Sequence, residues 1–331
     1  MKPVVTLGLL ALLAIGVLSI APFLGLHPIP VKAILESTAD NVEAEIFWNL
    51  RVPRVMAAFL AGAGLAVSGM SFQALFRNPL ATPFTLGVAS GAALGAALYL
   101  RLGLSFALLS ISGLTLSAFA GALGAILLVY GLTRVSRGFS ATSILLAGVA
   151  ISFFFSSLIL FIQYLSDFTQ SFHILRWLMG SLSIIGIEAV FEILPFVIGG
   201  TFAILFLSQE LNLLATGELL AASRGLNVRG IRSLLFFVTS LTVGGIVAIC
   251  GPIGFVGMMV PHICRLLVGA DHRLLAPATV LFGGSFLVLC DTLARNLIAP
   301  AEIPVGVITA LLGGPFFMWL LLRQTLEKGI I

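Results

Sequence analysis

The sequence has very few charged residues. Of its 331 residues, only 9% are Asp, Glu, Lys or Arg, while 60% are hydrophobic. A soluble domain carries about 25% charged residues, so this composition excludes an ordinary soluble protein and indicates a polytopic membrane protein. No polar interval is long enough to fold by itself. We therefore expect a single transmembrane domain over residues 1–331.

The residue patterns of several other classes are also missing. Cys250, Cys264 and Cys290 are scattered in or beside apolar segments, which fits small core residues and not a disulfide framework or a metal motif. The chain has no GxxxxGK[ST] motif and hence no phosphate loop. It has no HExxH or paired Asp inside an apolar run, which argues against an intramembrane enzyme. Its basic residues are dispersed, so nothing indicates nucleic acid binding.

Apolar runs of membrane-spanning length fill most of the chain and predict an all-α polytopic fold with about ten transmembrane helices. The first run is too long for a signal-peptide core and is kept as a span. An even number places both termini on one side, and the positive-inside rule makes that side cytoplasmic, with eleven Lys and Arg residues against six. The expected spans are 4–24, 55–75, 84–100, 106–132, 143–165, 188–207, 233–250, 255–269, 274–292 and 304–323.

A charged interval, about 210–232, separates the sixth and seventh spans. Its pattern predicts a short amphipathic helix ended by a glycine turn, lying against a cytoplasmic partner. A solvated loop is the alternative. The interval contains Glu210, Glu218, Arg224, Arg229 and Arg232, with glycines at 217, 225 and 230.

The polar segment from His27 to Arg54 is expected outside and ends in the sequence RVPR. Pro53 disfavours helix at Val52, so the second span should begin near Arg54. Two roles are open for Arg51 and Arg54. They fit interfacial anchors, which the residues alone favour, or cationic contacts for an acidic partner.

Three further segments carry polar groups. Thr142 and Ser143 begin the fifth span, where helix capping is the favoured role. Residues 171–182 are too short to cross and predict an outer interfacial or re-entrant segment. His262 has no His, Asp or Glu three or four residues away, which favours packing over proton relay. Glycines that would let helices approach closely lie in or beside the second and third spans: Gly62, Gly64, Gly69, Gly87, Gly91 and Gly95.

Five segments together resemble one family, the permease subunits of the iron-chelate, haem and vitamin B12 ABC importers (FecCD-type, type II). The resemblance covers nearly the whole chain, with the motifs in the right order. They are RVPR at 51–54, FRNPLATPFTLGVASGAALG at 76–95, the GELLAASRGLNV loop, GPIGFVGMMVPHICRLLVGADHR at 251–273, and AEIPVGVITALLGGPFFMWLL at 301–321.

The resemblance implies an assembly of two permease copies and two ABC ATPase subunits in a bacterial or archaeal plasma membrane. A periplasmic or lipid-anchored binding protein would deliver the cargo. This chain would be a non-catalytic subunit without a cofactor, since ATP and Mg bind to the ATPase. The cargo would be an iron chelate, either a siderophore or haem, and vitamin B12 is the alternative. A homodimer is expected, although pairing with a sister permease stays open.

The resemblance also implies roles for single residues. The coupling segment would dock on the ATPase, the start of the fifth span would form a cytoplasmic gate, and outer arginines would meet glutamates of the binding protein. The matching positions are Glu218, Ala222 and Gly225 for coupling, Thr142 and Ser143 for the gate, and Arg51, Arg54 and Arg295 for docking.

Transporters of other classes remain as alternatives. An ion-coupled secondary transporter needs carboxylates in mid-membrane, yet Glu188 and Asp291 lie near span ends. A channel is disfavoured by the partner-like interval between the sixth and seventh spans.

Overall fold

The computed structural model describes residues 3–25, 29–30, 42–108, 111–135, 140–183 and 186–328. Within these residues, seven helices are long and apolar enough to cross a membrane, and three more are apolar but shorter. Together they match the ten expected spans and confirm the all-α fold class. They are α1 (Pro3–Ile20), α4 (Val52–Phe76), α5 (Val88–Arg101), α6 (Gly113–Val135), α7 (Ala141–Leu165), α9 (Glu188–Phe206), α12 (Val228–Cys250), α13 (Val256–Val268), α14 (His272–Asn296) and α15 (Val305–Lys328).

Short elements connect the long helices. The strands β1 and β2 pair as an antiparallel hairpin between α5 and α6. The short elements are η1 (Ala21–Phe23), α3 (Val42–Glu45), η2 (Ile46–Arg51), η3 (Pro83–Leu86), β1 (Ala107–Leu108), β2 (Ile111–Ser112), α8 (Phe168–Leu178), α10 (Ser208–Ala215) and α11 (Glu218–Ser223).

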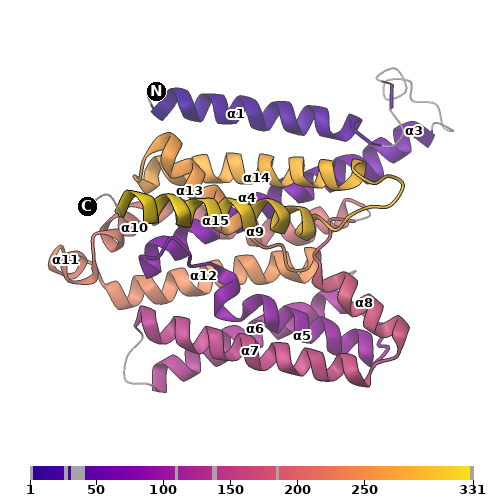
Figure 1. Ribbon diagram of the computed structural model, residues 1–331, viewed down its shortest axis with the longest axis horizontal. Coiled ribbons are helices and arrows are strands. Elements are labelled where there is room, and N and C mark those ends of the chain that lie inside the picture. Colours follow the sequence, from indigo (N-terminus) through magenta and orange to yellow (C-terminus); the bar gives the residue numbers. More distant parts are fainter. Residues whose placement is uncertain are drawn as a thin grey trace.

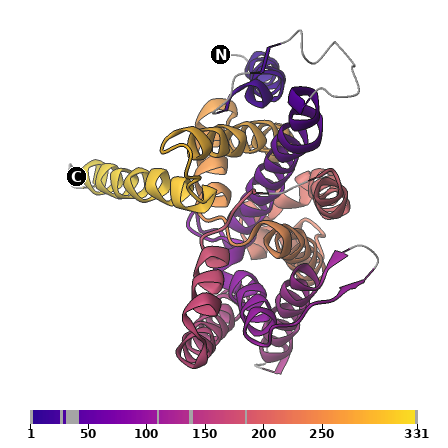
Figure 2. The same ribbon diagram turned by 90° about the vertical axis from the view of Figure 1, so that its right-hand side faces the viewer.

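The centre of the bundle is α4, which packs against α9, α12, α13 and α14. In its most apolar stretch 83% of the residues are buried, compared with 28% in α7 and in α9. Figures 1 and 2 show α4 passing through the middle of the molecule. The helix can occupy this place because it is built largely from Gly, Ala and Ser, which leave room for close neighbours.

Two glycine contacts set the closest helix approaches. A Cβ on Gly69 would collide with the carbonyl of Gly257, so α4 and α13 touch through their backbones. In the same way, Gly91 of α5 faces the carbonyl of Gly121 of α6. The prediction that glycines of the second and third spans serve packing is confirmed at these positions.

The start of the second span differs from the expectation. Helix α4 begins at Val52, two residues before Arg54, but helical structure already begins at Val42 and continues through η2, so the expectation that helix is disfavoured at Val52 was wrong. The η2 segment is a π-helix in which the amide of Val52 donates to the carbonyl of Phe47, and Val52 keeps helical dihedral angles. Pro53 then falls in the first turn of α4, where its missing amide costs nothing.

The two ends of the molecule carry different elements. Helix α11 lies at the same end as the start of α1 and the end of α15, whereas α3 and α8 lie at the opposite end (Figure 1). Helix α8 begins with a capping box between Asp167 and Gln170 and does not cross the bundle. With 11 residues it is too short to cross, as expected, and its place at the membrane surface stays a prediction. Of the polar segment between His27 and Arg54, residues 27–28 and 31–41 lie outside the described residues.

Candidate functional site

The charged interval folds as two short helices, α10 and α11, separated by Gly217. Helix α11 projects beyond the bundle (Figure 1). It exposes 88% of Leu219 and 56% of Leu220 and buries only Ala221. Gly225 follows with a φ of +84°. The expected short helix ended by a glycine turn is confirmed.

Hydrogen bonds and an ion pair fix the position of α11. The amide of Gly225 donates to the carbonyl of Ala222 at 2.9 Å, and the amide of Leu226 donates to that of Ala221 at 3.1 Å. These bonds close the helix in the manner of a glycine C-cap. At the other end of α11, Glu218 pairs with Arg232 of α12. Arg232 is 4% exposed, so the short helix is tied to the first turns of a long one.

Helix α10 anchors the same region to α14. The side-chain amide of Asn212 donates to Asp271 at 2.7 Å, and its oxygen accepts the backbone amide of His272 at 2.9 Å. The backbone amide of Arg273 and then the Asn212 amide stabilise the carboxylate and lower the pKa of Asp271. Together, α10 and α11 form a projection held on both α12 and α14.

An ion-pair cluster lies at the opposite end. Asp291 of α14 is 1% exposed and accepts from the Nε and Nη2 atoms of Arg54 at distances between 3.0 and 3.2 Å. The Nε atom of Arg295 lies 3.1 Å from the other oxygen of Asp291. Glu302 accepts from Arg54 at 2.9 Å and is 46% exposed. The cluster therefore joins α4 to α14 through charges that are largely withdrawn from solvent.

The three arginines expected to dock a partner thus differ in their surroundings. The side chains of Arg54 and Arg295 are 12% and 8% exposed and both contact Asp291. Arg51 lies in η2 and donates to the carbonyls of Pro22 and Phe23 at 3.2 and 3.3 Å. Each of the three contacts other groups of this chain, which sequence reasoning did not foresee. The spacing of Asp291 and Arg295, four residues apart on one helix, was the available signal.

The gate residues sit in the first turn of α7. Thr142 is exposed and Ser143 is half-buried. The helix is capped by Ser140, whose hydroxyl accepts the amide of Ser143 at 3.1 Å. The prediction that Thr142 or Ser143 caps the helix was wrong, because the helix begins at Ala141 and both residues fall inside it. Thr142 is thereby free of a capping role.

Other candidate ligands have packing roles. His262 of α13 lies edge-on against Phe316 of α15, with ring centres 5.9 Å apart, as the packing interpretation expected. Cys250, Cys264 and Cys290 are buried, which confirms them as core residues. In the described part of the chain, no three His, Cys, Asp or Glu side chains gather as a metal site would require.

Comparisons with known proteins agree on one family. The family model of the FecCD transport family matches residues 10–323. The hemin transport system permease of Yersinia pestis is 37% identical over 329 residues, which are 99% of this chain and 98% of that protein. The vitamin B12 import system permease of Salmonella paratyphi A is 40% identical over 292 residues, 86% of each protein.

A solved structure shares the fold as well. It is a metal-chelate type ABC transporter in an inward-facing conformation, 35% identical, with a TM-score of 0.85. The alignment covers 96% of this chain and 98% of the other. The family model spans residues 10–323, a range that contains α10, α11 and the cluster around Asp291. The chain therefore belongs to the FecCD transport family and is a permease subunit of an ABC importer.

Proposed function

We propose that the chain imports an iron chelate, a siderophore or haem, through a cavity between two permease subunits. A binding protein delivers the chelate, and two ATPase subunits supply the energy. The observation that carries this proposal is the projecting helix α11. It lies at the end where both termini lie, which the charge distribution of the sequence makes cytoplasmic.

Helix α11 has the features of a docking element for the ATPase. Leu219 and Leu220 are exposed at the end of the bundle that is proposed to face the cytoplasm. Apolar side chains in such a place favour a covering partner. Because Glu218 and Arg232 tie α11 to α12, a displacement of α11 would be passed to a membrane-crossing helix. Glu218, Ala222 and Gly225 are the proposed coupling residues.

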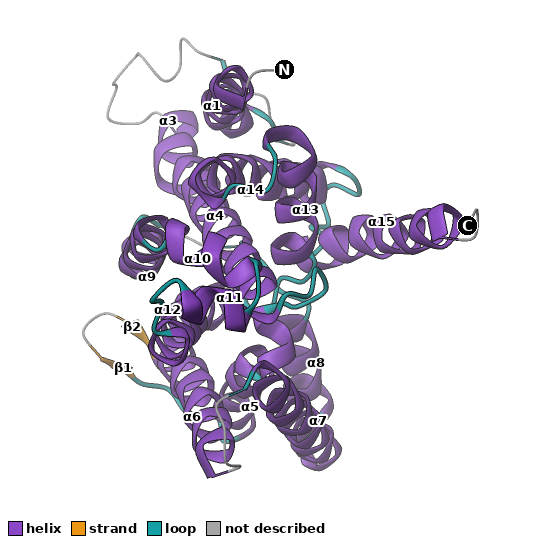
Figure 3. Ribbon diagram, turned by 90° about the vertical axis from the view of Figure 1, so that its left-hand side faces the viewer, coloured by secondary structure: helices purple, strands orange, loops and turns teal. Residues whose placement is uncertain are grey.

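Helices α7 and α15 have the features of an interface with a second permease copy, identical or a sister protein. Figures 2 and 3 show α15 standing away from the bundle, and it packs only on α13 and α14 among the element contacts described. Helix α7 exposes Phe153, Phe154 and Phe161. Two such helices from each copy would enclose a mostly apolar conduit, which releases a bulky chelate readily because it binds weakly.

The cargo is proposed from likeness to relatives. The hemin permease is 37% identical and matches 99% of this chain, and the vitamin B12 permease is 40% identical and matches 86%, so a corrinoid is kept as the alternative cargo. The test is ATP-driven uptake into proteoliposomes that contain the chain, its ATPase and its binding protein. We expect uptake of haem or a ferric siderophore and none of cobalamin. Uptake of cobalamin alone would select the alternative cargo, and ATP-independent uptake would contradict the importer as a whole.

The proposed gate is tested by replacing Thr142 with a larger residue. Because this side chain is exposed, Thr142→Trp should leave the fold intact and obstruct the narrow entrance where two copies meet. We expect uptake to fall at least about tenfold while the ATPase still binds. The matched control is Leu132→Trp, at an exposed position near the end of α6. Equal uptake by the two variants would remove Thr142 and Ser143 from the gate.

The docking proposal is tested best at Arg51, because Arg54 and Arg295 are mostly occupied by Asp291. We expect Arg51→Glu to weaken binding of the binding protein about tenfold, by replacing an attractive charge with a repulsive one. Surface plasmon resonance on the reconstituted permease measures this affinity. Arg101→Glu changes the net charge equally at the end of α5 and should have little effect. An unchanged affinity of the Arg51 variant would leave Arg51 with a structural role only.

A further inference from the structure

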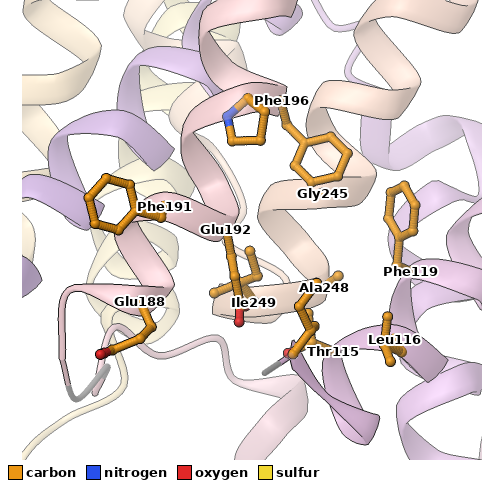
Figure 4. Close-up of a pocket in the computed structure, with 12 residues that line it drawn as sticks. Thr115, Leu116, Phe119, Glu188, Phe191, Glu192, Phe196, Gly245, Ala248 and Ile249 are labelled. Carbon is orange, nitrogen blue, oxygen red and sulfur yellow. The ribbon is translucent and has the colours of Figure 1, made fainter. Parts of the chain in front are cut away.

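The permease chain also contains a cavity that none of the proposed coupling, gate or docking residues lines. A cavity of about 510 Å³ opens between α6, α9 and α12. Its wall is apolar and aromatic, with Phe119 from α6, Phe196 from α9 and Ile249 from α12. Figure 4 shows these side chains around a common space. A volume of this size is typical of sites for small organic molecules.

Two carboxylates, Glu188 and Glu192, interrupt this apolar wall. They lie one turn apart on α9, and the described residues that line the cavity include no Lys, Arg or His. No hydrogen bond or ion pair joins either carboxylate to another described residue. Like charges four residues apart on a helix repel. Glu188 is exposed, whereas Glu192 is half-buried among apolar side chains, where a carboxylate without a counter-charge is unfavourable. The arrangement therefore favours a cation that enters from outside the chain.

The aromatic side chains suit the same kind of ligand. Phe119 and Phe196 lie with ring centres 5.1 Å apart and an angle of 55° between their planes. Phe191, 64% exposed, adds a third ring at the cavity. The faces of aromatic rings attract cations, and attraction is strongest where water is excluded. Carboxylates and rings together thus match a cation with an apolar body.

The expected position of α9 in the membrane helps to distinguish a lipid headgroup from another cation as the ligand. Its 19 residues span about 28 Å, close to the hydrocarbon thickness of a bilayer. Glu188, the first residue, then lies near the headgroups, and Glu192 lies about 6 Å deeper. A phospholipid would bring its phosphate to this level, where the described lining of the cavity offers two carboxylates and no basic side chain. A lipid headgroup is therefore disfavoured relative to a cation without a phosphate.

We propose that the cavity between α6, α9 and α12 binds a lipophilic organic cation. The apolar body of the ligand packs on Phe119, Phe191 and Phe196, and its cationic centre lies at Glu188 and Glu192. This site is formed within one permease chain and does not depend on the proposed cargo. A ligand there would bridge three membrane helices, one of which, α12, also holds α11 through Arg232.

The test uses the full chain in phosphatidylcholine nanodiscs and tetraphenylphosphonium as the probe. Equilibrium dialysis, corrected for binding to empty nanodiscs, should give saturable binding of one cation per chain. Tetraphenylborate has the same shape and the opposite charge and should show no saturable binding. Glu192→Gln should lower the affinity for tetraphenylphosphonium about tenfold or more, because a charged partner is lost. Phe191→Leu, at an exposed position, should lower it a few-fold.

Controls distinguish a site from general adsorption. Glu43→Gln removes the same charge from α3, outside the cavity, and should leave the affinity unchanged. Unaltered binding by Glu192→Gln in a variant that elutes as a single folded species would overturn the proposal. So would equal binding of tetraphenylborate, which would indicate apolar partition alone. If phosphatidylethanolamine nanodiscs abolish the binding of the probe, the occupant is a lipid headgroup and a free cation is ruled out.

Discussion

Replacing Gly225 with valine is expected to reduce ATP-driven uptake at least about tenfold, since a loss near 1.4 kcal/mol changes an affinity tenfold. Gly225 has a φ of +84°, in the left-handed region. A side chain there costs about 1–2 kcal/mol, and a β-branched residue fits it worst. A Cβ at Gly225 would meet no atom within 4 Å, so the effect comes from backbone strain and not from a clash.

The strain acts on the element proposed to bind the ATPase. The turn at Gly225 provides the two hydrogen bonds that close α11, which has only six residues. If the turn changes, Leu219 and Leu220 are presented in a different direction, and the ATPase loses its contact. Pull-down of the ATPase and uptake in proteoliposomes should fall together, while ATP hydrolysis by the released ATPase no longer drives transport.

A matched control separates coupling from folding. Gly103 also has a positive φ, of +58°, and open space around its Cβ. It follows the end of α5, whose last carbonyl, that of Arg101, accepts the side-chain amide of Gln170 in α8. Because α8 lies at the end opposite to α11 (Figure 1), Gly103→Val imposes similar strain far from the proposed contact. Normal coupled uptake by Gly225→Val, or an equal loss in both variants, would count against α11 as the coupling element.

The crossing helices could be predicted because each depends on local composition. Runs of about twenty apolar residues specify a span without knowledge of its neighbours. Helix α11 was predictable for a similar reason, since Gly225 follows a short helical pattern in a charged interval and glycine commonly ends a helix. What α10 and α11 contact was not predictable. The pairing of Asn212 with Asp271 joins residues 59 positions apart, and their types carry no signal for it.

Two predictions of helix starts, those of the second span and of α7, were wrong because a general rule did not hold locally. The rule that helix is disfavoured before proline placed the start of the second span near Arg54. The π-helix η2 instead continues directly into α4, and Pro53 lies in the first turn of α4. The cap of α7 was placed two or three residues late, because three residues able to cap (Ser140, Thr142 and Ser143) stand close together in the sequence. Only the position where the helix begins chooses among them.

The cluster around Asp291 shows a further limit of the sequence. Arg54 and Asp291 are 237 positions apart, and both read as outer-surface residues near the ends of apolar runs. In the fold they lie in the interior, between α4 and α14. The role of Arg54 and Arg295 as partner contacts therefore competes with a structural role, and one substitution distinguishes the two.

Asp291→Asn is expected to lower the free energy of unfolding by about 3–5 kcal/mol, because it removes the carboxylate from a buried pair and leaves charged arginines behind. Asp291 is 1% exposed, and the side chains of Arg54 and Arg295 are only 12% and 8% exposed, so little solvent is available to replace the lost carboxylate. Unfolding in detergent micelles, followed by circular dichroism against denaturant, measures the loss. Glu302→Gln is the control, since Glu302 also contacts Arg54 but is 46% exposed, and its loss should cost less than about 1 kcal/mol.

The same two variants decide what the arginines do. If Arg54 and Arg295 mainly hold α4 against α14, Asp291→Asn destabilises the fold and the surviving folded protein still binds its delivery partner. If they mainly serve docking, Asp291→Asn costs little stability and frees both guanidinium groups, so the affinity for an acidic partner rises. Equal and small effects of Asp291→Asn and Glu302→Gln on stability would show that Asp291 is well solvated. That result would support Arg54 and Arg295 as docking residues for the binding protein.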